Sequence, residues 1–267
     1  MSFSELKRAA TSHRPELVIE AGGLALFMIS ALGFTALLEH PASPVHRAIP
    51  HPLLRRALMG CAMGATLLAL VYSRFGKRSG AHFNPFFTLT FFRLGKVAPA
   101  DALLYALSHF AGAIAGVAAI SPALSMFLSH AQVHYAATRP GAAGTGVAFA
   151  GELAISFTQM LLVLGVSNSR RWNAWTGVFA ACGVATYITL EAPLSGMSMN
   201  PARTLGSALG AHDFTALWLY FSAPLLGMLL AAELYLRVCG VQCVRCAKLH
   251  HENGERCIFR CKYGAAV

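Results

Sequence analysis

The chain has 267 residues, of which 56% are hydrophobic and only 12% are charged, and its net charge is +10. Soluble domains carry roughly 25% charged residues, so this composition excludes an ordinary soluble domain and indicates several membrane spans. The Lys and Arg residues crowd the segments between the apolar runs, which indicates topology-setting loop charge rather than a nucleic-acid partner.

The N-terminal segment, residues 1–15, is polar and basic, and we expect it to be a short cytoplasmic N-terminus. It does not resemble a cleavable signal peptide, because the apolar run that follows is too long for one. Six runs then have the length of about 20 residues that a membrane-spanning helix needs. They cover residues 16–38, 54–73, 101–122, 148–168, 172–192 and 214–237.

Two further apolar segments, Pro85–Phe92 and Pro201–Leu209, are too short to span a bilayer, and each opens with an Asn-Pro pair. Residues 79–89 and 195–205 both read Ser-Gly-x-x-x-Asn-Pro-x-x-Thr-Leu. A single Asn-Pro pair starts many ordinary helices, because Asn is a good N-cap and Pro suits the first helical position. Two copies in matching context instead predict two half-helices.

The repeat divides the membrane region, residues 16–238, into halves at about 16–122 and 148–238. Each half contains three spans, so the second half must insert upside down, and the two half-helices enter from opposite faces and meet at the midplane. Irregular backbone at membrane depth persists only where it is buried in protein or lines a water-filled cavity. The repeat therefore predicts a lumen.

The distribution of basic residues sets the orientation of the spans. With both termini on one side, that side collects most of the Lys and Arg residues, including Arg170, Arg171 and those from Arg237 onward. Positive residues are retained in the cytoplasm. We therefore expect an integral protein of the plasma (inner) membrane with both termini in the cytoplasm.

The two motifs carry a family resemblance. Ser79–Pro85 reads S-G-A-H-F-N-P, and Asn200–Arg203 reads N-P-A-R. In this paired context they resemble the motifs of the aquaporin and glycerol-facilitator family, the major intrinsic proteins, over about Glu16 to Leu236. The resemblance implies an all-α membrane fold with six transmembrane helices and two re-entrant half-helices, assembled as a homotetramer. It also implies a passive channel for water and small uncharged, glycerol-like solutes that excludes ions and protons and has no enzymatic activity.

The resemblance assigns six motif residues to the pore midplane. Two half-helix N-termini meeting there bring together positive dipole ends, each equivalent to roughly half a charge. The two Asn amides cap these ends and offer donors to a passing molecule, so we expect neutral molecules to pass while cations meet an unfavourable potential. The six residues are Asn84, Pro85, Phe86, Asn200, Pro201 and Ala202.

By resemblance, Arg203 belongs to an outer constriction together with Met197, Ile188 and, in the second span, Gly64 or its neighbour Met63. Strict water channels of the family usually place a His and a bulky aromatic residue among these positions, and this sequence has neither there. We therefore expect a more apolar selectivity filter that admits small uncharged solutes alongside water.

Further residues are assigned by resemblance or left open. His82 matches a pore-lining His of the family, and Glu20 and Glu152 match acids that brace the loops before the half-helices by accepting bonds from unpaired N–H groups. Phe86 replaces the Ala that is usual in the first motif, and either packs against a neighbouring helix or narrows the lumen. Glu191 either pairs with the filter arginine or points toward polar groups of the loop.

The C-terminal tail, residues 239–267, is basic and rich in Cys and His. In a reducing cytoplasm its thiols are not expected to form disulfides. Four thiolates with His250 and His251 nearby suit a tetrahedral zinc ion, whereas palmitoylated or merely exposed cysteines in a membrane-hugging tail are the alternatives. The candidate zinc ligands are Cys243, Cys246, Cys257 and Cys261.

Three other functions stay open at this point. Inverted repeats and broken helices also build secondary transporters, although these need ionisable groups at the midplane, where this sequence has two neutral amides. A membrane-bound enzyme or redox sensor acting through the tail would need a nucleophile-and-base set or a dinucleotide loop, and neither accompanies it. The third is a closed or gated member of the same fold that its Cys-rich tail regulates.

Overall fold

The regular secondary structure is helical throughout residues 2–251 and 253–263, the part of the chain that this computed structural model describes. The six long helices are α2 (Arg14–Glu39), α4 (Pro52–Tyr72), α7 (Pro99–Leu128), α8 (Gly144–Ser167), α9 (Thr176–Leu190) and α12 (Leu217–Cys239). The half-helices are α6 (Pro85–Arg93) and α11 (Pro201–Ala211). The short elements are α1 (Phe3–Ser12), α3 (Pro44–Ala48), α5 (Arg74–Ser79), α10 (Ala192–Ser195), η1 (His134–Ala136), η2 (Asn173–Trp175) and η3 (Val241–Cys243).

Five of the long helices, namely α2, α4, α7, α8 and α12, are long and apolar enough to cross a membrane. The helix within the expected span over residues 172–192 is shorter than that range, because η2 occupies the start of the segment and α9 has only 15 residues. Pro193 accounts for the end of α9, since a proline there lacks a helical N–H and its ring would clash with the carbonyl of Thr189. Glu191 forms the C-cap of α9, and α10 follows it directly.

The long helices pack in three pairs, α2 with α7, α8 with α12, and α4 with α9. Small residues let the helix backbones approach closely where no hydrophobic effect drives association. A Cβ atom at Gly112 of α7 would clash with the carbonyl oxygen of Ala21, and one at Gly227 of α12 would clash with that of Leu153. The first pair belongs to the first half of the chain and the second to the other half, as the inverted repeat requires, while α4 and α9 join the halves.

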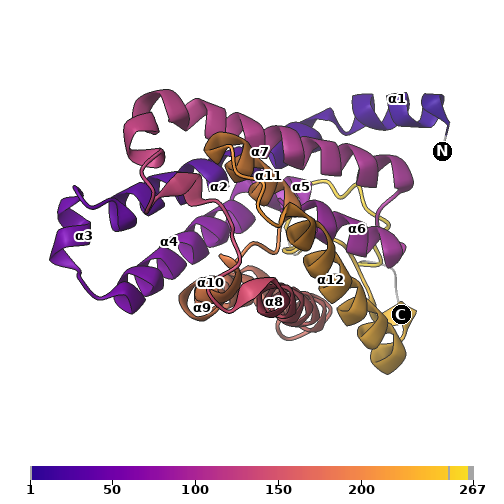
Figure 1. Cartoon of the computed structure of the whole chain (residues 1–267). Coiled ribbons are helices and arrows are strands. Elements are labelled where there is room, and N and C mark those ends of the chain that lie inside the picture. Colours follow the sequence, from indigo (N-terminus) through magenta and orange to yellow (C-terminus); the bar gives the residue numbers. More distant parts are fainter. Residues whose placement is uncertain (1, 252, 264–267) are drawn as a thin grey trace.

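The half-helices α6 and α11 lie within this framework, where both pack against α7 and α12 (Figure 1). Each begins with a proline and is capped by the preceding asparagine. Most of their side chains are buried, because each half-helix is surrounded by long helices instead of lipid.

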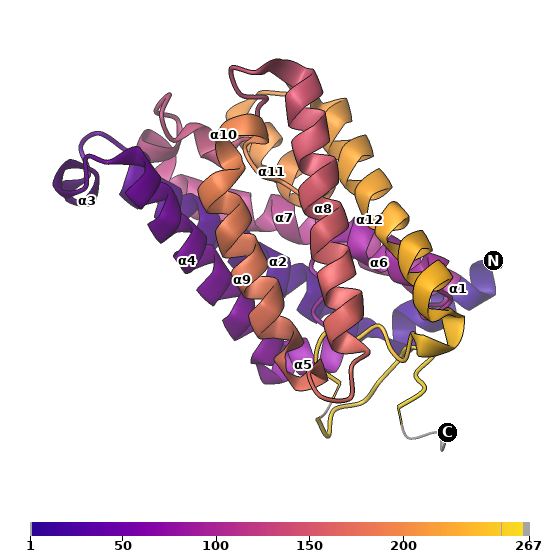
Figure 2. The same ribbon diagram turned by 90° about the horizontal axis from the view of Figure 1, so that it is seen from below.

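The two ends of the helix bundle differ, as Figure 2 shows. The C-terminal tail, drawn in yellow, runs along the end that holds α5, whereas α3 and α10 lie at the opposite end. We call these ends the tail side and the opposite side. Although the tail is basic in sequence, Val244, Cys246 and Ala247 are at most 2% exposed, so the tail is packed against the bundle.

The N-terminal segment also contains a helix, α1, which its polar composition did not predict. Ser2 caps α1, and Glu5 completes a capping box by accepting a hydrogen bond from the Ser2 N–H. The pattern Ser-x-x-Glu is a recognised start signal for a helix, so the sequence did carry the information.

Candidate functional site

The two motif asparagines lie at the N-termini of α6 and α11 and make matching bonds. Asn84 Oδ1 accepts from the Phe86 N–H at 2.9 Å, and Asn200 Oδ1 accepts from the Ala202 N–H at 3.1 Å. Each side-chain Nδ2 crosses to the other half of the chain, from Asn84 to the Met199 carbonyl and from Asn200 to the Phe83 carbonyl, both at 2.8 Å. Each asparagine therefore caps its own half-helix and fastens the loop before the other one.

Two buried glutamates brace these loops in the same way in each half. Glu20 accepts from the N–H groups of His82 and Phe83, at 3.2 and 2.7 Å. Its partner in the repeat, Glu152, accepts from the N–H groups of Ser198 and Met199, at 2.6 and 2.8 Å. Both glutamates are 0% exposed. These bonds pair backbone N–H groups that form no helical hydrogen bond. Such groups need a partner when the loop that contains them is buried.

The loops need this bracing because their backbone is strained. Ala81, Phe83, Met197 and Met199 all have positive φ angles, between 50° and 57° except for Phe83 at 46°. Such conformations are unfavourable for residues with a Cβ atom and persist only where the surroundings enforce them.

A cavity of about 440 Å³ runs through the bundle between the half-helices. It takes in both motif asparagines and extends from Glu39 and Arg56 on the opposite side to His82 and Leu249 on the tail side. Three of the four residues expected in the filter line it, namely Arg203, Met197 and Ile188.

Of the two second-span candidates, Gly64 and Met63, only Met63 lies in the cavity lining. A Cβ atom at Gly64 would lie 2.9 Å from the carbonyl oxygen of Ala181, so Gly64 faces α9. Its small size permits the close contact of α4 and α9.

The arginine of the filter has an unused donor. Arg203 Nη1 is buried, and within the described chain it has no hydrogen-bond partner. None of the ion pairs formed by residues 2–251 and 253–263 includes Arg203. Because the side chain lines the cavity, this guanidinium group can donate a hydrogen bond to a molecule inside it.

The two residues that the sequence left open, Phe86 and Glu191, both lie outside the cavity lining. Phe86 is 6% exposed and belongs to the hydrophobic core, so it packs among its neighbours and leaves the lumen free. Glu191 forms no ion pair with Arg203 in the described structure, and its Oε1 would lie 2.5 Å from a Cβ atom placed on Gly151 of α8.

The tail reaches the tail-side end of the cavity, which the sequence did not predict. His82 Nε2 lies 2.8 Å from the Ala247 carbonyl and Nδ1 lies 2.8 Å from Thr88 Oγ1. A carbonyl can only accept, so Nε2 carries the hydrogen and Nδ1 of the neutral ring accepts from the threonine hydroxyl. The ring of Phe259 stacks on the His82 ring at a centroid distance of 5.2 Å. The sequence of the tail does not predict these contacts, because the residues that it contacts lie in a distant part of the chain.

Further bonds fix the tail to loops of both halves. The Arg260 N–H donates to the Lys96 carbonyl at 2.9 Å, and the Arg245 N–H donates to Asn168 Oδ1 at 2.7 Å. Burial lowers the pKa of Lys96, whose Nζ lies 3.4 Å from the Arg245 carbonyl.

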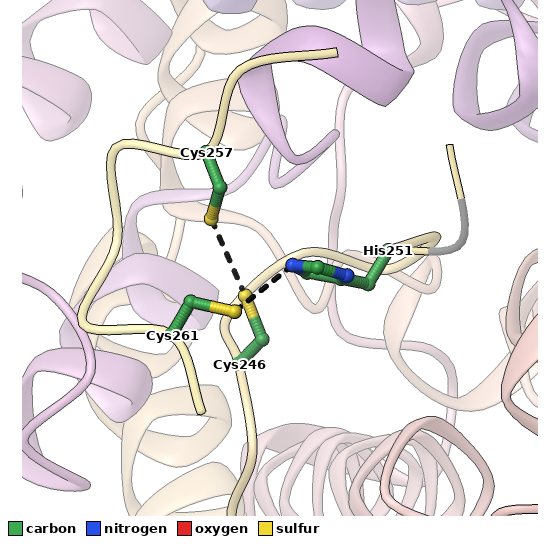
Figure 3. Close-up of side chains that lie close together, drawn as sticks. All are labelled: Cys246, His251, Cys257 and Cys261. Carbon is green, nitrogen blue, oxygen red and sulfur yellow. Dashed lines mark hydrogen bonds between the residues drawn. The ribbon is translucent and has the colours of Figure 1, made fainter. Parts of the chain in front are cut away.

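Three of the four candidate zinc ligands gather in the tail, and a histidine takes the fourth place (Figure 3). The ligand atoms of Cys246, His251, Cys257 and Cys261 all lie within 4.8 Å of one another. Cys243 lies outside this group, and its Sγ lies 2.8 Å from the Cys239 carbonyl. The sequence named the histidine pair but could not show which imidazole turns toward the thiols.

Comparisons with known proteins agree with this architecture. The family model described as "Major intrinsic protein" matches residues 10–235. The "Probable aquaporin NIP-type" of Nicotiana alata is 32% identical over 173 residues, which are 64% of this chain and 62% of that protein. The "Glycerol uptake facilitator protein-like 6" of Lactiplantibacillus plantarum is 32% identical over 177 residues, 65% of this chain and 81% of that protein.

A solved structure shares the fold. The X-ray structure of the aquaglyceroporin from Plasmodium falciparum superposes with a TM-score of 0.67 and 20% sequence identity, covering 86% of this chain and 98% of that one. The chain spans less than two thirds of the length of the plant relatives that it matches, 62% and 58% for two of them.

Proposed function

The chain belongs to the major intrinsic protein family, and we propose that it forms a passive membrane channel for water and small uncharged solutes such as glycerol. The observation that carries this proposal is the cavity between the two half-helices, which both motif asparagines and Arg203 line. We propose a channel rather than an enzyme, because the polar groups of this cavity are suited to hydrogen-bond a passing molecule.

Exclusion of ions follows from the same groups. The N-termini of α6 and α11 each contribute a positive partial charge of roughly half a unit near the asparagines. Arg203 adds a full positive charge on the cavity wall. A cation therefore meets an unfavourable potential, and a water molecule held by donors on both sides does not pass a proton onward.

The composition of the filter supports passage of small polyols. Met63, Ile188 and Met197 give it apolar walls, and Arg203 gives it a donor. A polyol can direct its hydroxyl groups to the arginine and its CH groups to the apolar walls, so that it loses less hydration energy than it would in a bare apolar pore. Similarity to a protein named as a glycerol uptake facilitator supports the same solute class.

The wider setting is also part of the proposal. The distribution of Lys and Arg supports an orientation in the plasma (inner) membrane with both termini, and hence the tail side, in the cytoplasm. Family membership supports a homotetramer in which each protomer contains its own pore. Water and small neutral solutes are then the partners of each pore, and lipid surrounds the assembly.

Light scattering by proteoliposomes after osmotic shock tests the proposal, once with an impermeant osmolyte and once with glycerol. From the full chain or from a chain whose tail is removed, we expect shrinkage faster than that of empty liposomes in both, followed by re-swelling only in glycerol. Shrinkage without re-swelling would mean that the pore passes water alone. A chain truncated after Gly240 keeps all residues matched by the family model, 10–235. If neither this truncated chain nor the full chain gives shrinkage faster than that of empty liposomes, the channel proposal is wrong.

A further inference from the structure

The C-terminal tail brings three thiols and one imidazole together at a place that the cavity does not include (Figure 3). We propose that Cys246, His251, Cys257 and Cys261 bind one Zn²⁺ ion, and that this ion holds the tail across the tail-side mouth of the cavity and closes it. The binding site stands on its own geometry. The closure rests on the proposed channel function.

The arrangement of the four ligand atoms is close to that of a zinc site. Cys246 Sγ and Cys257 Sγ are 3.6 Å apart, and Cys261 Sγ lies 2.9 Å from His251 Nε2. In a tetrahedral site with Zn–S bonds of about 2.3 Å, two sulfur atoms are about 3.8 Å apart. All four atoms lie within 4.8 Å of one another, so shifts of roughly 1 Å complete the geometry. Three thiolates with one imidazole are a common structural zinc set.

Neighbouring groups orient these ligands, as outer partners do in metal sites. The His251 ring stacks on Tyr263 at a centroid distance of 4.3 Å, with the planes 12° apart. The Tyr263 N–H also donates to Cys261 Sγ at 3.3 Å. Lys248 Nζ donates to the carbonyls of Glu255 and Arg256, at 3.1 and 2.7 Å, and so fixes the chain just before Cys257.

The charge of the tail suits the bound form. Three thiolates with one Zn²⁺ carry a single net negative charge, which nearby basic residues can balance. The basic residues of the described tail are Arg245, Lys248, Arg256, Arg260 and Lys262.

The tail also needs a cross-link to hold its conformation. After η3 the tail contains no helix or strand in residues 244–251 and 253–263, and we call these two stretches its arms. A backbone hydrogen bond from the Lys262 N–H to the Arg245 carbonyl, at 2.8 Å, joins the far ends of the two arms. A segment this short cannot bury enough apolar surface to hold a fold by itself, and small modules commonly use a structural metal instead. A zinc ion at the cluster supplies the cross-link that regular structure would otherwise give.

The contacts at the cavity mouth come from residues between the ligands. Ala247, whose carbonyl accepts from His82, directly follows Cys246. Leu249 lines the cavity, and its N–H donates to the Gly80 carbonyl at 3.1 Å. Phe259, which stacks on the His82 ring, lies between Cys257 and Cys261 in sequence. Joining the ligands therefore holds both arms of the tail on the pore-lining histidine.

The zinc content of the full-length protein, purified in detergent with a thiol reductant, tests the site by elemental mass spectrometry. We expect one zinc per chain, and a loss of nearly all of it in the double variant Cys257→Ser, Cys261→Ser. Cys243→Ser is the matched control, because Cys243 is a tail cysteine outside the cluster, and it should keep its zinc. A wild-type zinc content equal to that of the double variant would overturn the site. So would an intact mass that has lost two hydrogens, which would indicate a disulfide.

Water permeability of proteoliposomes tests the closure. We expect chelator-stripped protein to conduct several-fold faster than zinc-loaded protein, and re-addition of zinc to restore the slow rate. Phe259→Ala should conduct fast while keeping its zinc, because it removes the stacked ring and leaves the ligands intact. Equal rates with and without zinc, at a level above empty liposomes, would overturn the closure and leave the channel standing. If stripped protein, Phe259→Ala and the truncated chain all match empty liposomes, the channel proposal fails, and the measured zinc content still decides the site.

Discussion

At the scale of single residues, the filter shows how much one position matters. The motifs predicted Arg203 and Met197, because these residues lie within or beside the repeat. The second-span residue stayed open between Gly64 and Met63, because one step along a helix turns a side chain by about 100°, and sequence alone does not fix that rotation. The Met63 side chain lies in the cavity lining, and it makes the expected filter more apolar than a glycine would.

Substitution of Ile188 tests the filter directly. Ile188→Phe should place a larger ring in the lining and reduce glycerol permeability by about tenfold, which corresponds to roughly 1.4 kcal/mol of added barrier, while water permeability falls less. Ile188→Val is the control, since it shortens the side chain without narrowing the cavity. Stopped-flow light scattering with both osmolytes measures the ratio. An unchanged ratio in Ile188→Phe would show that Ile188 does not limit the solute.

At the scale of elements, the repeat predicted the two half-helices, and the family resemblance implied that a glutamate braces the loop before each of them. The late start of α9 was not predicted, because the apolar run begins at residue 172 and composition does not distinguish the 3₁₀ turn η2 from the first turn of a longer helix. Gly112 and Gly116 of α7 lie four residues apart, a spacing of small residues that is typical of close helix contacts, but this spacing does not identify α2 as the partner helix.

The close pairing of α2 and α7 depends on Gly112. Gly112→Ala should destabilise the protein by about 1–3 kcal/mol, because the added methyl group would meet the Ala21 backbone. Gly33→Ala on α2 is the matched control, since nothing lies within 4 Å of its added Cβ. Thermal unfolding in detergent compares the two variants. Equal midpoints for both would contradict the close contact.

The loop before α11 depends on Glu152. Glu152→Gln should cost roughly 1–3 kcal/mol, because an amide NH₂ replaces an acceptor and leaves a buried N–H of Ser198 or Met199 unpaired. Glu233→Gln is the control, because Glu233 forms a half-exposed ion pair with Arg93, and such pairs contribute little. The folded fraction and midpoint by thermal unfolding report the difference. A loss in Glu233→Gln as large as that in Glu152→Gln would argue against the bracing role.

At the scale of the whole molecule, the position of the tail was beyond sequence reasoning. Its cysteines and histidines made a zinc site one of several alternatives, whereas the contact between His82 and Ala247 joins residues 165 apart in the chain. Long-range contacts of this kind depend on the completed bundle and leave no local pattern. The sequence left regulation by the tail as an alternative without locating the contact, and the structure places the tail at one end of the cavity.

Limited trypsin digestion tests how tightly the tail is held. Removing zinc should increase the cleavage rate after Lys248 and the neighbouring tail arginines several-fold, because Lys248 is only 3% exposed while the tail is folded. Cleavage after Lys7 and Arg8 of α1 is the internal control and should not change. Mass spectrometry of the released peptides identifies each site. A tail rate that stays constant after chelation would mean that the metal does not hold this segment.

The crossed bonds of the asparagines also set an order of events during synthesis. Asn84 Nδ2 bonds to the carbonyl of Met199, 115 residues later in the chain. At a translation rate of about 5–20 residues per second, the ribosome needs roughly 6 to 23 s to make that partner. Throughout this interval the first half-helix is present in the membrane without the loop that fastens it. The nascent first half is therefore an unfinished intermediate, and any delay in inserting the second half prolongs its exposure to quality control.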